Sequence, residues 1–326
     1  MTDLTTTSRT AIRGFRAGDG PPLVETWRRS APADAITADR FRSLVLLDPN
    51  FDPEGLRVAV DGGRVVGAAY AVRRLTPLAG TDLEPEQGWI PFFFVDPAAH
   101  GRGLGRRLLT DALDWLHGHG RTRVDFSSYT PDYVLPGLDA EAYPRAAALL
   151  ESLGFRTLYE ATAMHRGLVG YRLPDDVARR LGELTARGHR FTTPSDDDLV
   201  DLLALAGGHF GPDWACTIRA CLTAGTPLDR IVVARDPAGR MSGWAMHGAF
   251  DAVDERFGPI GVREEMRGTG LGEVLLHLVL ERMRARRAHS AWFLWTGARS
   301  PAGHLYRKAG FSGTRVFRVL RREASR

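Results

Sequence analysis

Two segments of the chain carry the same pattern of apolar positions at helical spacing. In the first segment, the apolar positions on one helix face are Leu104, Leu108, Leu109, Ala112, Leu113 and Leu116. At a constant offset, the second segment has the apolar positions Leu271, Leu275, Leu276, Val279, Leu280 and Met283. Positions on the other face are not kept, since Arg106 corresponds to Glu273. The pattern predicts one fold that is used twice, with the same helix face buried each time.

Alternating and continuous apolar runs predict the elements around these helices. In the first half we expect strands at 11–16, 56–60, 64–70, 88–95, 123–128 and 158–168, and helices at 21–29, 38–47, 104–116 and 145–153. In the second half we expect strands at 189–193, 231–235, 241–250 and 257–262, and helices at 174–188, 196–206 and 213–222. These elements indicate an α/β (α+β) fold with two tandem domains, at 1–169 and 189–326, and a connecting helix within 170–188.

A glycine-rich loop precedes each of the two repeated helices. The first loop is His100-Gly101-Arg102-Gly103-Leu104-Gly105, and the second loop is Arg267-Gly268-Thr269-Gly270-Leu271-Gly272. Glycine lets the backbone approach a ligand closely, and a helix start offers unpaired N–H groups, so both loops suit a pyrophosphate. The spacing is not the G-x-G-x-x-G of a dinucleotide fold. A Walker loop is excluded as well, because the single lysine, Lys308, lies far from both loops.

Both loops resemble the acyl-CoA loop of the GNAT superfamily of N-acyltransferases, written Arg/Gln-x-x-Gly-x-Gly/Ala. The second loop fits fully, whereas the first has His100 in place of Arg or Gln. The resemblance implies two domains, each with a mixed, mostly antiparallel, twisted sheet flanked by helices, and acetyl-CoA as cosubstrate. Members of this family splay two neighbouring strands to admit the acyl-pantetheine arm. The resemblance therefore implies that two strands of this chain separate at Pro91. The implied acetyl-CoA contacts are Ile260, Val262, Arg267, Gly268, Thr269, Gly270, Leu271 and Gly272 in the second half, and Val95, His100, Gly101, Arg102, Gly103, Leu104 and Gly105 in the first.

The end of the second half resembles the closing motif of the same family, Leu-Tyr-x-x-x-Gly-Phe. It reads Leu305-Tyr306 and, after three residues, Gly310-Phe311. In that family the tyrosine commonly stands beside the thioester sulfur, where a phenol can protonate the leaving thiolate. The first half has Leu150 at this position, and leucine donates no proton. The resemblance therefore implies that the C-terminal domain is the catalytic one, with Tyr306 as its acid.

A general base must also take a proton from the amine nucleophile. Asp251, Asp254 and Glu255 lie in the turn before the strand at 257–262, where family members often place a carboxylate. We take Glu255 as the candidate base, although a solvated turn explains each of these carboxylates as well. His247 and His304 are further candidates, and the sequence does not rank them.

Composition narrows the classes of function. A length of 326 residues favours two domains, and the net charge of +4 comes from arginines spread along the chain, with no long basic tract for nucleic acid. No apolar run has the length of a membrane span, and 1–13 lacks a signal-peptide core. Cys216 and Cys221 read as two thiols, at least one of them buried, without metal-site spacing. We expect a cytoplasmic monomer or homodimer without a metal.

The implied function is transfer of an acetyl or acyl group from acetyl-CoA to a primary amine of a small molecule or peptide. The alternative is a non-enzymatic CoA-binding sensor or scaffold protein, in which both loops bind and neither domain turns over. The closing motif around Tyr306 favours the enzyme.

Overall fold

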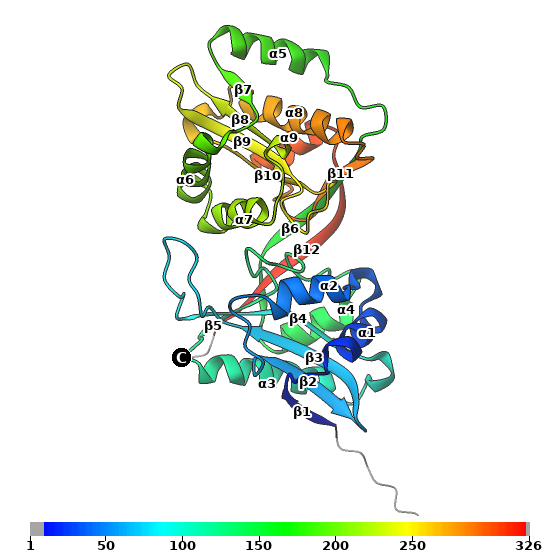
Figure 1. Cartoon of the computed structure of the whole chain (residues 1–326). Helices are drawn as coiled ribbons and strands as arrows, with labels where there is room; N and C mark the ends of the chain where they lie inside the picture. Colours follow the sequence, from blue (N-terminus) through cyan, green and yellow to red (C-terminus); the bar gives the residue numbers. More distant parts are fainter. Residues whose placement is uncertain (1–9, 324–326) are drawn as a thin grey trace, which may run out of the picture. The chain divides into compact units, whose positions relative to one another are not determined.

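The computed structural model describes residues 10–323, and its elements follow the predicted order (Figure 1). Of the N-terminal stretch 1–13, residues 1–9 lie outside the described part. The first half has strands β1 (Ala11–Gly14), β2 (Leu56–Asp61), β3 (Arg64–Val72), β4 (Gln87–Val95), β5 (Arg123–Phe126) and β6 (Arg156–Gly167). Its helices are α1 (Gly20–Ser30), α2 (Ala38–Phe41), α3 (Leu104–Gly118) and α4 (Pro144–Ser152). The predicted helix 38–47 is α2 followed by a π-helical turn, Arg42–Leu46.

The second half has strands β7 (Arg190–Thr192), β8 (Ile231–Arg235), β9 (Met241–His247), β10 (Phe257–Val262), β11 (Ser290–Phe293) and β12 (Ser312–Glu323). Its helices are α5 (Asp175–Ala186), α6 (Leu199–His209), α7 (Pro212–Thr223), α8 (Leu271–Ala285) and α9 (Pro301–Lys308). The two repeated helices are therefore α3 and α8. Their predicted apolar faces are buried: the six residues of α3 are at most 4% exposed, and the six of α8 are 0% exposed.

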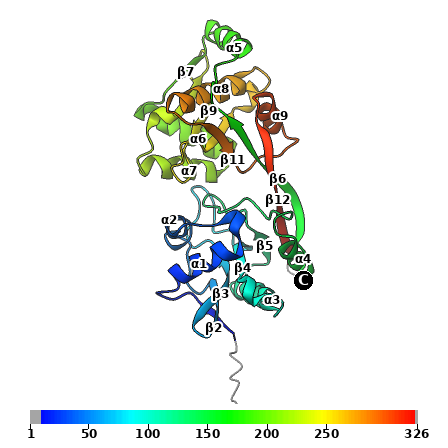
Figure 2. The same ribbon diagram turned by 90° about the vertical axis from the view of Figure 1, so that its right-hand side faces the viewer.

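The sheet of the first half has helices on both faces. Figure 2 shows α1 and α2 on one side of its strands and α3 on the other. Leu23 and Trp27 of α1 pack in one apolar core with Tyr70, whereas Leu108 of α3 packs in a second core with Ile90. Strand neighbours run in the order β1-β2-β3-β4-β5-β12, antiparallel except for the parallel pair β4–β5. This mixed, mostly antiparallel sheet is the predicted one.

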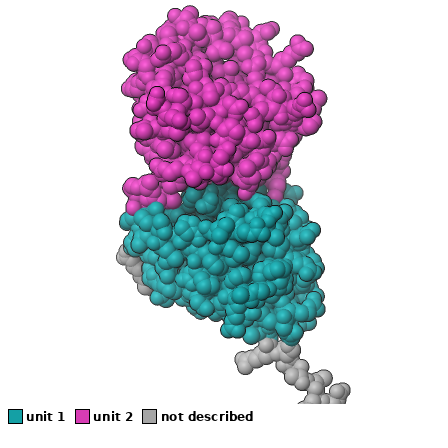
Figure 3. Space-filling model, viewed as in Figure 1, with its two compact units in different colours: residues 1–77, 82–160, 317–326 teal, residues 78–81, 161–316 magenta. Residues whose placement is uncertain are grey.

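The chain divides into two compact units (Figure 3). Two strands, β6 and β12, run from one unit into the other. Unit 1 contains residues 1–77, 82–160 and 317–326, and unit 2 contains 78–81 and 161–316. The last strand, β12, thus begins in unit 2 and ends in unit 1, where Leu320–Glu323 pair antiparallel with β5. Conversely, β6 begins in unit 1 and continues into unit 2, where it pairs with β11. The predicted boundaries at 169 and 189 stay a prediction about the folding domains, whereas the compact units divide both strands.

Unit 2 repeats the layered arrangement. Its four-stranded sheet has the order β10-β9-β8-β7. Leu275 of α8 packs with Val232 and Ala245 in one core, while Leu202 of α6 packs with Trp244 in another. Because α5 packs on α8 through Val177, Leu184 and Val274, the predicted connecting helix is an integral part of unit 2. The cysteine prediction is also confirmed, since Cys221 is buried and Cys216 is partly buried, both as free thiols.

Candidate functional site

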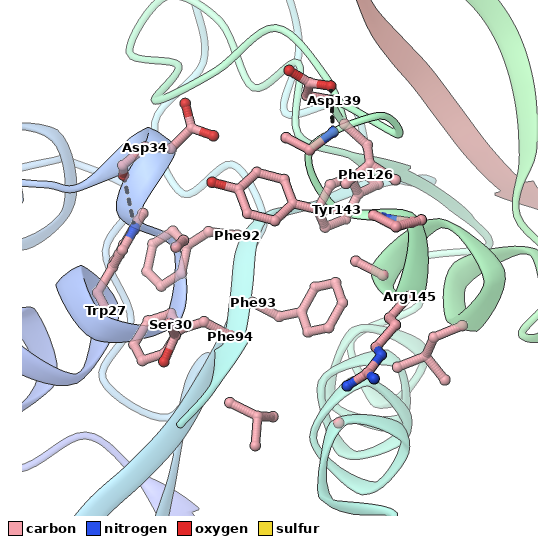
Figure 4. A pocket seen from close by; sticks show the side chains of 18 of the residues that line it. Trp27, Ser30, Asp34, Phe92, Phe93, Phe94, Phe126, Asp139, Tyr143 and Arg145 are labelled. Carbon is pink, nitrogen blue, oxygen red and sulfur yellow. Dashed lines mark hydrogen bonds between the residues drawn. The ribbon is translucent and has the colours of Figure 1, made fainter. Parts of the chain in front are cut away.

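A cavity of about 620 Å³ in unit 1 is lined by residues from both faces of β4 (Figure 4). Phe92 and Phe94 belong to the core beneath α1, whereas Phe93 and Val95 pack against the core of α3 and α4. Alternate residues of a strand point to opposite faces of its sheet. A single cavity lined by both sets therefore passes through the sheet, along the edge of β4. We call this cavity the channel.

The channel exists because β4 and β5 separate. Their parallel pairing runs from Gln87–Arg123 to Ile90–Phe126 and ends there. The next residue, Pro91, has no backbone N–H to continue the ladder. On its other edge, β4 stays paired with β3, through Gly67–Val95 and Tyr70–Phe92. The expected separation of two strands at Pro91 is thereby confirmed, and it leaves one edge of β4 open to the channel.

One end of the channel is formed by the first loop. Gly101 and Gly103 have left-handed φ angles of 76° and 70°, and Gly103 is the N-cap of α3. A Cβ placed on either glycine would meet nothing within 4 Å. The predicted residues Val95, His100, Gly101, Gly103, Leu104 and Gly105 all line the channel. The remaining one, Arg102, is 65% exposed at its side chain and lies 3.7 Å from Asp61.

The position of the first loop is fixed by Asp96, which sequence patterns did not single out. Its Oδ1 accepts a hydrogen bond from the backbone N–H of Ala98 at 3.0 Å, and its Oδ2 pairs with Arg29 at 2.9 Å. Burial raises the pKa of Asp96, but these hydrogen bonds outweigh it and hold the pKa below its usual value. Nearby, the ring Nε2 of His100 lies 3.0 Å from the carbonyl oxygen of Val95.

The other end of the channel is aromatic. The ring centroid of Trp27 lies 4.2 Å from that of Phe92 and 5.3 Å from that of Phe94. The indole Nε1 of Trp27 donates a hydrogen bond to the carbonyl oxygen of Asp34 at 3.0 Å, which fixes both the ring and the turn that carries Asp34. Figure 4 shows Tyr143 with its hydroxyl pointing toward the side of Asp34 and Phe92. These residues come from separate segments without a shared motif, so the sequence alone did not indicate them.

The two ends differ in charge. Arg106 of α3 and Arg145 of α4 line the channel on the side of the first loop, and the guanidinium of Arg106 donates to Ser152 Oγ at 2.7 Å. Asp34 and Asp139 line it at the aromatic end, away from Arg145 in Figure 4. The channel therefore joins a cationic end to an anionic one.

The second loop is covered by a side chain. Gly270 has a φ of 87° and is the N-cap of α8, as Gly103 is of α3. A Cβ on Gly270 would lie 2.9 Å from Cδ of Arg180, which belongs to α5. Thr269 donates its hydroxyl to the carbonyl of Met266 at 2.8 Å, and Arg267 lies 3.5 Å from the carboxylate of Glu264. Unlike the first loop, this loop has a cationic side chain over its central glycine.

Tyr306 lies in an aromatic core. It is 8% exposed, its ring centroid lies 4.4 Å from that of Phe293, and Phe257 and Phe311 surround it. Burial raises the pKa of its phenol. Glu255 is engaged elsewhere, because its Oε1 accepts from the backbone N–H of His289 at 3.4 Å.

The other candidate bases are also held by neighbours. His247 is 0% exposed, its Nδ1 lies 2.8 Å from the carbonyl oxygen of Asp254, and burial lowers its pKa. Asp251 pairs with Arg256 at 2.8 Å. Asp254 pairs with Arg230 at 2.5 Å. His304 lies 3.1 Å from a guanidinium nitrogen of Arg307. Two of the predicted acetyl-CoA contacts, Ile260 and Val262, are half-buried on β10, where they pair with Ala245 and Gly243 of β9.

Comparison with known families gives two matches, one in each half of the chain. Residues 22–133 match the model of the acetyltransferase (GNAT) family, and residues 227–313 match that of the acetyltransferase (GNAT) domain. Together these matches span more than half of the 326 residues. The chain belongs to the GNAT superfamily. As a tandem GNAT protein it is an acetyl-CoA-dependent N-acetyltransferase.

Relatives and solved structures agree with this tandem GNAT architecture. The chain is 27% identical over 315 residues to a mycothiol acetyltransferase of Clavibacter michiganensis subsp. michiganensis, which covers 90% of this chain and 88% of the relative. A tandem GNAT protein from the clavulanic acid biosynthesis pathway superposes with a TM-score of 0.66 at 16% identity, covering 98% of this chain and 99% of that one. A GCN5-related N-acetyltransferase of Sphaerobacter thermophilus gives 0.69 at 18% identity, covering 96% and 95%. In the described part of this GNAT protein, every helix is too short or too polar to cross a membrane.

Proposed function

We propose that acetyl transfer takes place in the channel of unit 1, with acetyl-CoA at the first loop and an amine acceptor at the aromatic end. The observation that carries this proposal is that one cavity joins the glycine loop to the opposite face of the sheet. Donor and acceptor then approach from opposite faces and meet beside β4. A cavity of about 620 Å³ is within the range of small-molecule sites.

The first loop fits the pyrophosphate of acetyl-CoA. Left-handed glycines at Gly101 and Gly103 leave open space where side chains would otherwise project. The N-terminus of α3 adds unpaired N–H groups and the positive end of the helix dipole. Arg106, in the first turn of α3 after this loop, and Arg145 of α4 both line the channel and bring positive charge to it. An anionic donor is therefore favoured at this end.

When bound, acetyl-CoA supplies an acetyl thioester. Transfer to an amine forms one C–N bond and breaks one C–S bond, so the amine gives up a proton and the sulfur gains one. At the position of the family tyrosine, Leu150 is 0% exposed and has no proton to give. Tyr143, seven residues earlier at the start of α4, lines the channel with its phenol. We assign the proton transfer to the sulfur to Tyr143.

The competing proposal places the reaction in the C-terminal domain, with Tyr306 as acid and Glu255 as base. The complete second loop and the closing motif favour it. Against it stand the side chain of Arg180 over Gly270 and the aromatic packing of Tyr306. A sensor or scaffold role for both loops lacks support, since the chain is an N-acetyltransferase.

Two valine variants separate these proposals. Gly103→Val places a β-branched side chain in the open space of the first loop, and Gly270→Val places one against the side chain of Arg180 in the second. We expect Gly103→Val to abolish release of free thiol from acetyl-CoA, and Gly270→Val to leave most of it. Calorimetry with CoA gives binding independently of turnover.

The matched control is Gly120→Val, at the other end of α3. Gly120 has a φ of 77° and open space around its Cβ position, so its substitution strains the backbone equally without touching the loop. Activity that survives Gly103→Val but disappears in Gly270→Val would place the reaction in the C-terminal domain.

A further inference from the structure

The aromatic end of the channel has few groups available to a polyhydroxylated ligand. Ser30 donates its hydroxyl to the carbonyl of Thr26 at 2.7 Å, and Ser127 donates its own to the carbonyl of Leu135. The Oδ1 of Asp139 accepts from the backbone N–H groups of Glu141 and Ala142 at 3.1 and 3.0 Å. A sugar brings several hydroxyls into this place, more than its aromatic walls and the two carboxylates, Asp34 and Asp139, can pair, so part of its hydration is lost without replacement.

The same end suits a flat apolar body that carries a positive charge. Trp27, Phe92 and Phe94 form one aromatic wall, and Tyr143 faces it across the channel in Figure 4. Asp34 and Asp139 add two carboxylates there, while the guanidinium groups of Arg106 and Arg145 line the loop side. An ammonium group is attracted both to carboxylates and to aromatic faces.

From this arrangement we infer that the acceptor is an arylalkylamine, an ammonium group on a short chain that ends in an aromatic ring. The ring packs against Trp27, Phe92 and Phe94, and the ammonium group lies toward Asp34. Asp34 is held in place by its own turn, since its backbone carbonyl accepts from the indole of Trp27 at 3.0 Å. This inference rests on the proposed function, because it names the acceptor of the same channel.

Binding by calorimetry, without acetyl-CoA, tests the inference on the whole chain. Phenethylamine and glucosamine are the two probes, and 2-phenylethanol is the uncharged analogue of the first. We expect phenethylamine to bind at least tenfold more tightly than either of the others. Equal or tighter binding of glucosamine would overturn the inference.

The decisive variant is Asp34→Asn, which keeps the shape of the side chain and removes its charge. We expect it to weaken phenethylamine binding at least tenfold and to raise the KM for that amine, with the KM for acetyl-CoA unchanged. Its control is Asp39→Asn, which removes an exposed carboxylate of α2 that pairs with Arg42, three residues later in the chain. If both variants bind phenethylamine like the unmodified chain, Asp34 has no role in recognition and the inference is wrong.

The valine variants keep this test apart from the proposed function. If Gly103→Val abolishes turnover while glucosamine is a better acceptor than phenethylamine, the proposed function is supported and the arylalkylamine inference is wrong. If Gly103→Val leaves turnover intact while Asp34→Asn still weakens phenethylamine binding, the binding site stands and the site of catalysis moves.

Discussion

At the scale of single residues, Tyr306 and Leu150 occupy corresponding places in the two closing motifs, and both are buried. The proposed site in unit 1 predicts that Tyr306→Phe changes kcat less than twofold. The ring stays among Phe257, Phe293 and Phe311, so the stability should hardly move either. Steady-state kinetics on a true acceptor provide the measurement. A positioned acid raises the rate of a reaction by roughly a hundredfold to ten-thousandfold. A fall in kcat of that size in Tyr306→Phe would indicate that the C-terminal domain is the catalytic one.

His277 predicts a pH dependence of stability. It is 3% exposed on α8, and its Nδ1 lies 2.7 Å from the hydroxyl of Tyr171. Burial, aided by the charge of Arg166, lowers its pKa to about 4, whereas Glu273 and Asp176 oppose the shift. As the pH falls below about 6.5, the unfolded chain takes up a proton that the folded chain does not. Stability is therefore full above pH 6.5 and falls by up to roughly 3 kcal/mol as the pH approaches 4.

The variant His277→Gln removes this titration, and we expect a flatter dependence of the melting temperature on pH between 6.5 and 4. His289→Gln, at an exposed histidine of the same unit, is the control and should keep the slope. An unchanged slope in His277→Gln would show that other groups govern the acid sensitivity.

The residues that the sequence indicated at the first loop follow from a contiguous motif. The spacing of glycines in a sequence by itself indicates a loop with left-handed backbone positions, so Gly101 and Gly103 could be predicted without any tertiary information. Trp27, Asp34 and Tyr143 could not be found in this way, because only the folded sheet brings their segments to one cavity. Arg180 was equally hidden, since its place over Gly270 depends on how α5 packs on α8.

At the scale of elements, the strand pair before each loop has the same register in both units. The large and the small side chain of one cross-strand pair, however, lie on opposite strands in the two units. In unit 1, Ala68 of β3 faces Phe94 of β4, next to the pair Gly67–Val95. In unit 2, Trp244 of β9 faces Gly261 of β10, next to the pair Gly243–Val262. A Cβ on Gly261 would lie 2.5 Å from the indole of Trp244, so only glycine fits there. The large ring has changed strands between the two copies.

This exchange predicts coupling between two substitutions in unit 2. Gly261→Phe overpacks the core, and Trp244→Ala leaves a cavity that costs about 3–5 kcal/mol. The double variant restores the small–large order of unit 1, so we expect it to be more stable than the summed losses, by about 0.5–3 kcal/mol. Urea unfolding of the four chains measures the difference. Leu116→Ala in unit 1 is the second-site control and should combine additively with Gly261→Phe.

Periodicity predicted the helices and strands well because each buries one face, and a buried face leaves its spacing in the sequence. All twelve repeated apolar positions of α3 and α8 are buried, as this reasoning requires. Periodicity does not indicate which strands are neighbours in a sheet. The strand expected at 158–168 is β6, whereas no strand was expected at the position of β12. Nothing in the residues of either strand indicates that it continues from one unit into the other.

At the scale of the whole molecule, the end of the chain completes the unit that contains the channel. Phe317, Val319 and Leu320 of β12 are at most 1% exposed, and Arg321 makes two hydrogen bonds with Asp125 of β5, at 2.6 and 2.8 Å. The backbone of Arg318 exchanges two hydrogen bonds with that of Leu138, at 2.9 and 2.8 Å. Leu138 lines the channel, so the last strand holds part of its wall.

A chain that stops after Val316 should therefore lose the channel and the CoA site at the first loop. Removing three buried apolar side chains costs roughly 5–9 kcal/mol, comparable with the whole stability of a domain. We expect calorimetry to detect no CoA binding at the first loop of this shortened chain. A chain that stops after Glu323 is the control and should bind CoA normally. The milder variant Arg318→Pro removes the N–H donor to Leu138 together with the guanidinium that lies 3.5 Å from Glu151, and we expect it to weaken binding of phenethylamine while the unit stays folded. Normal CoA binding by the chain that stops after Val316 would show that unit 1 forms its channel without β12.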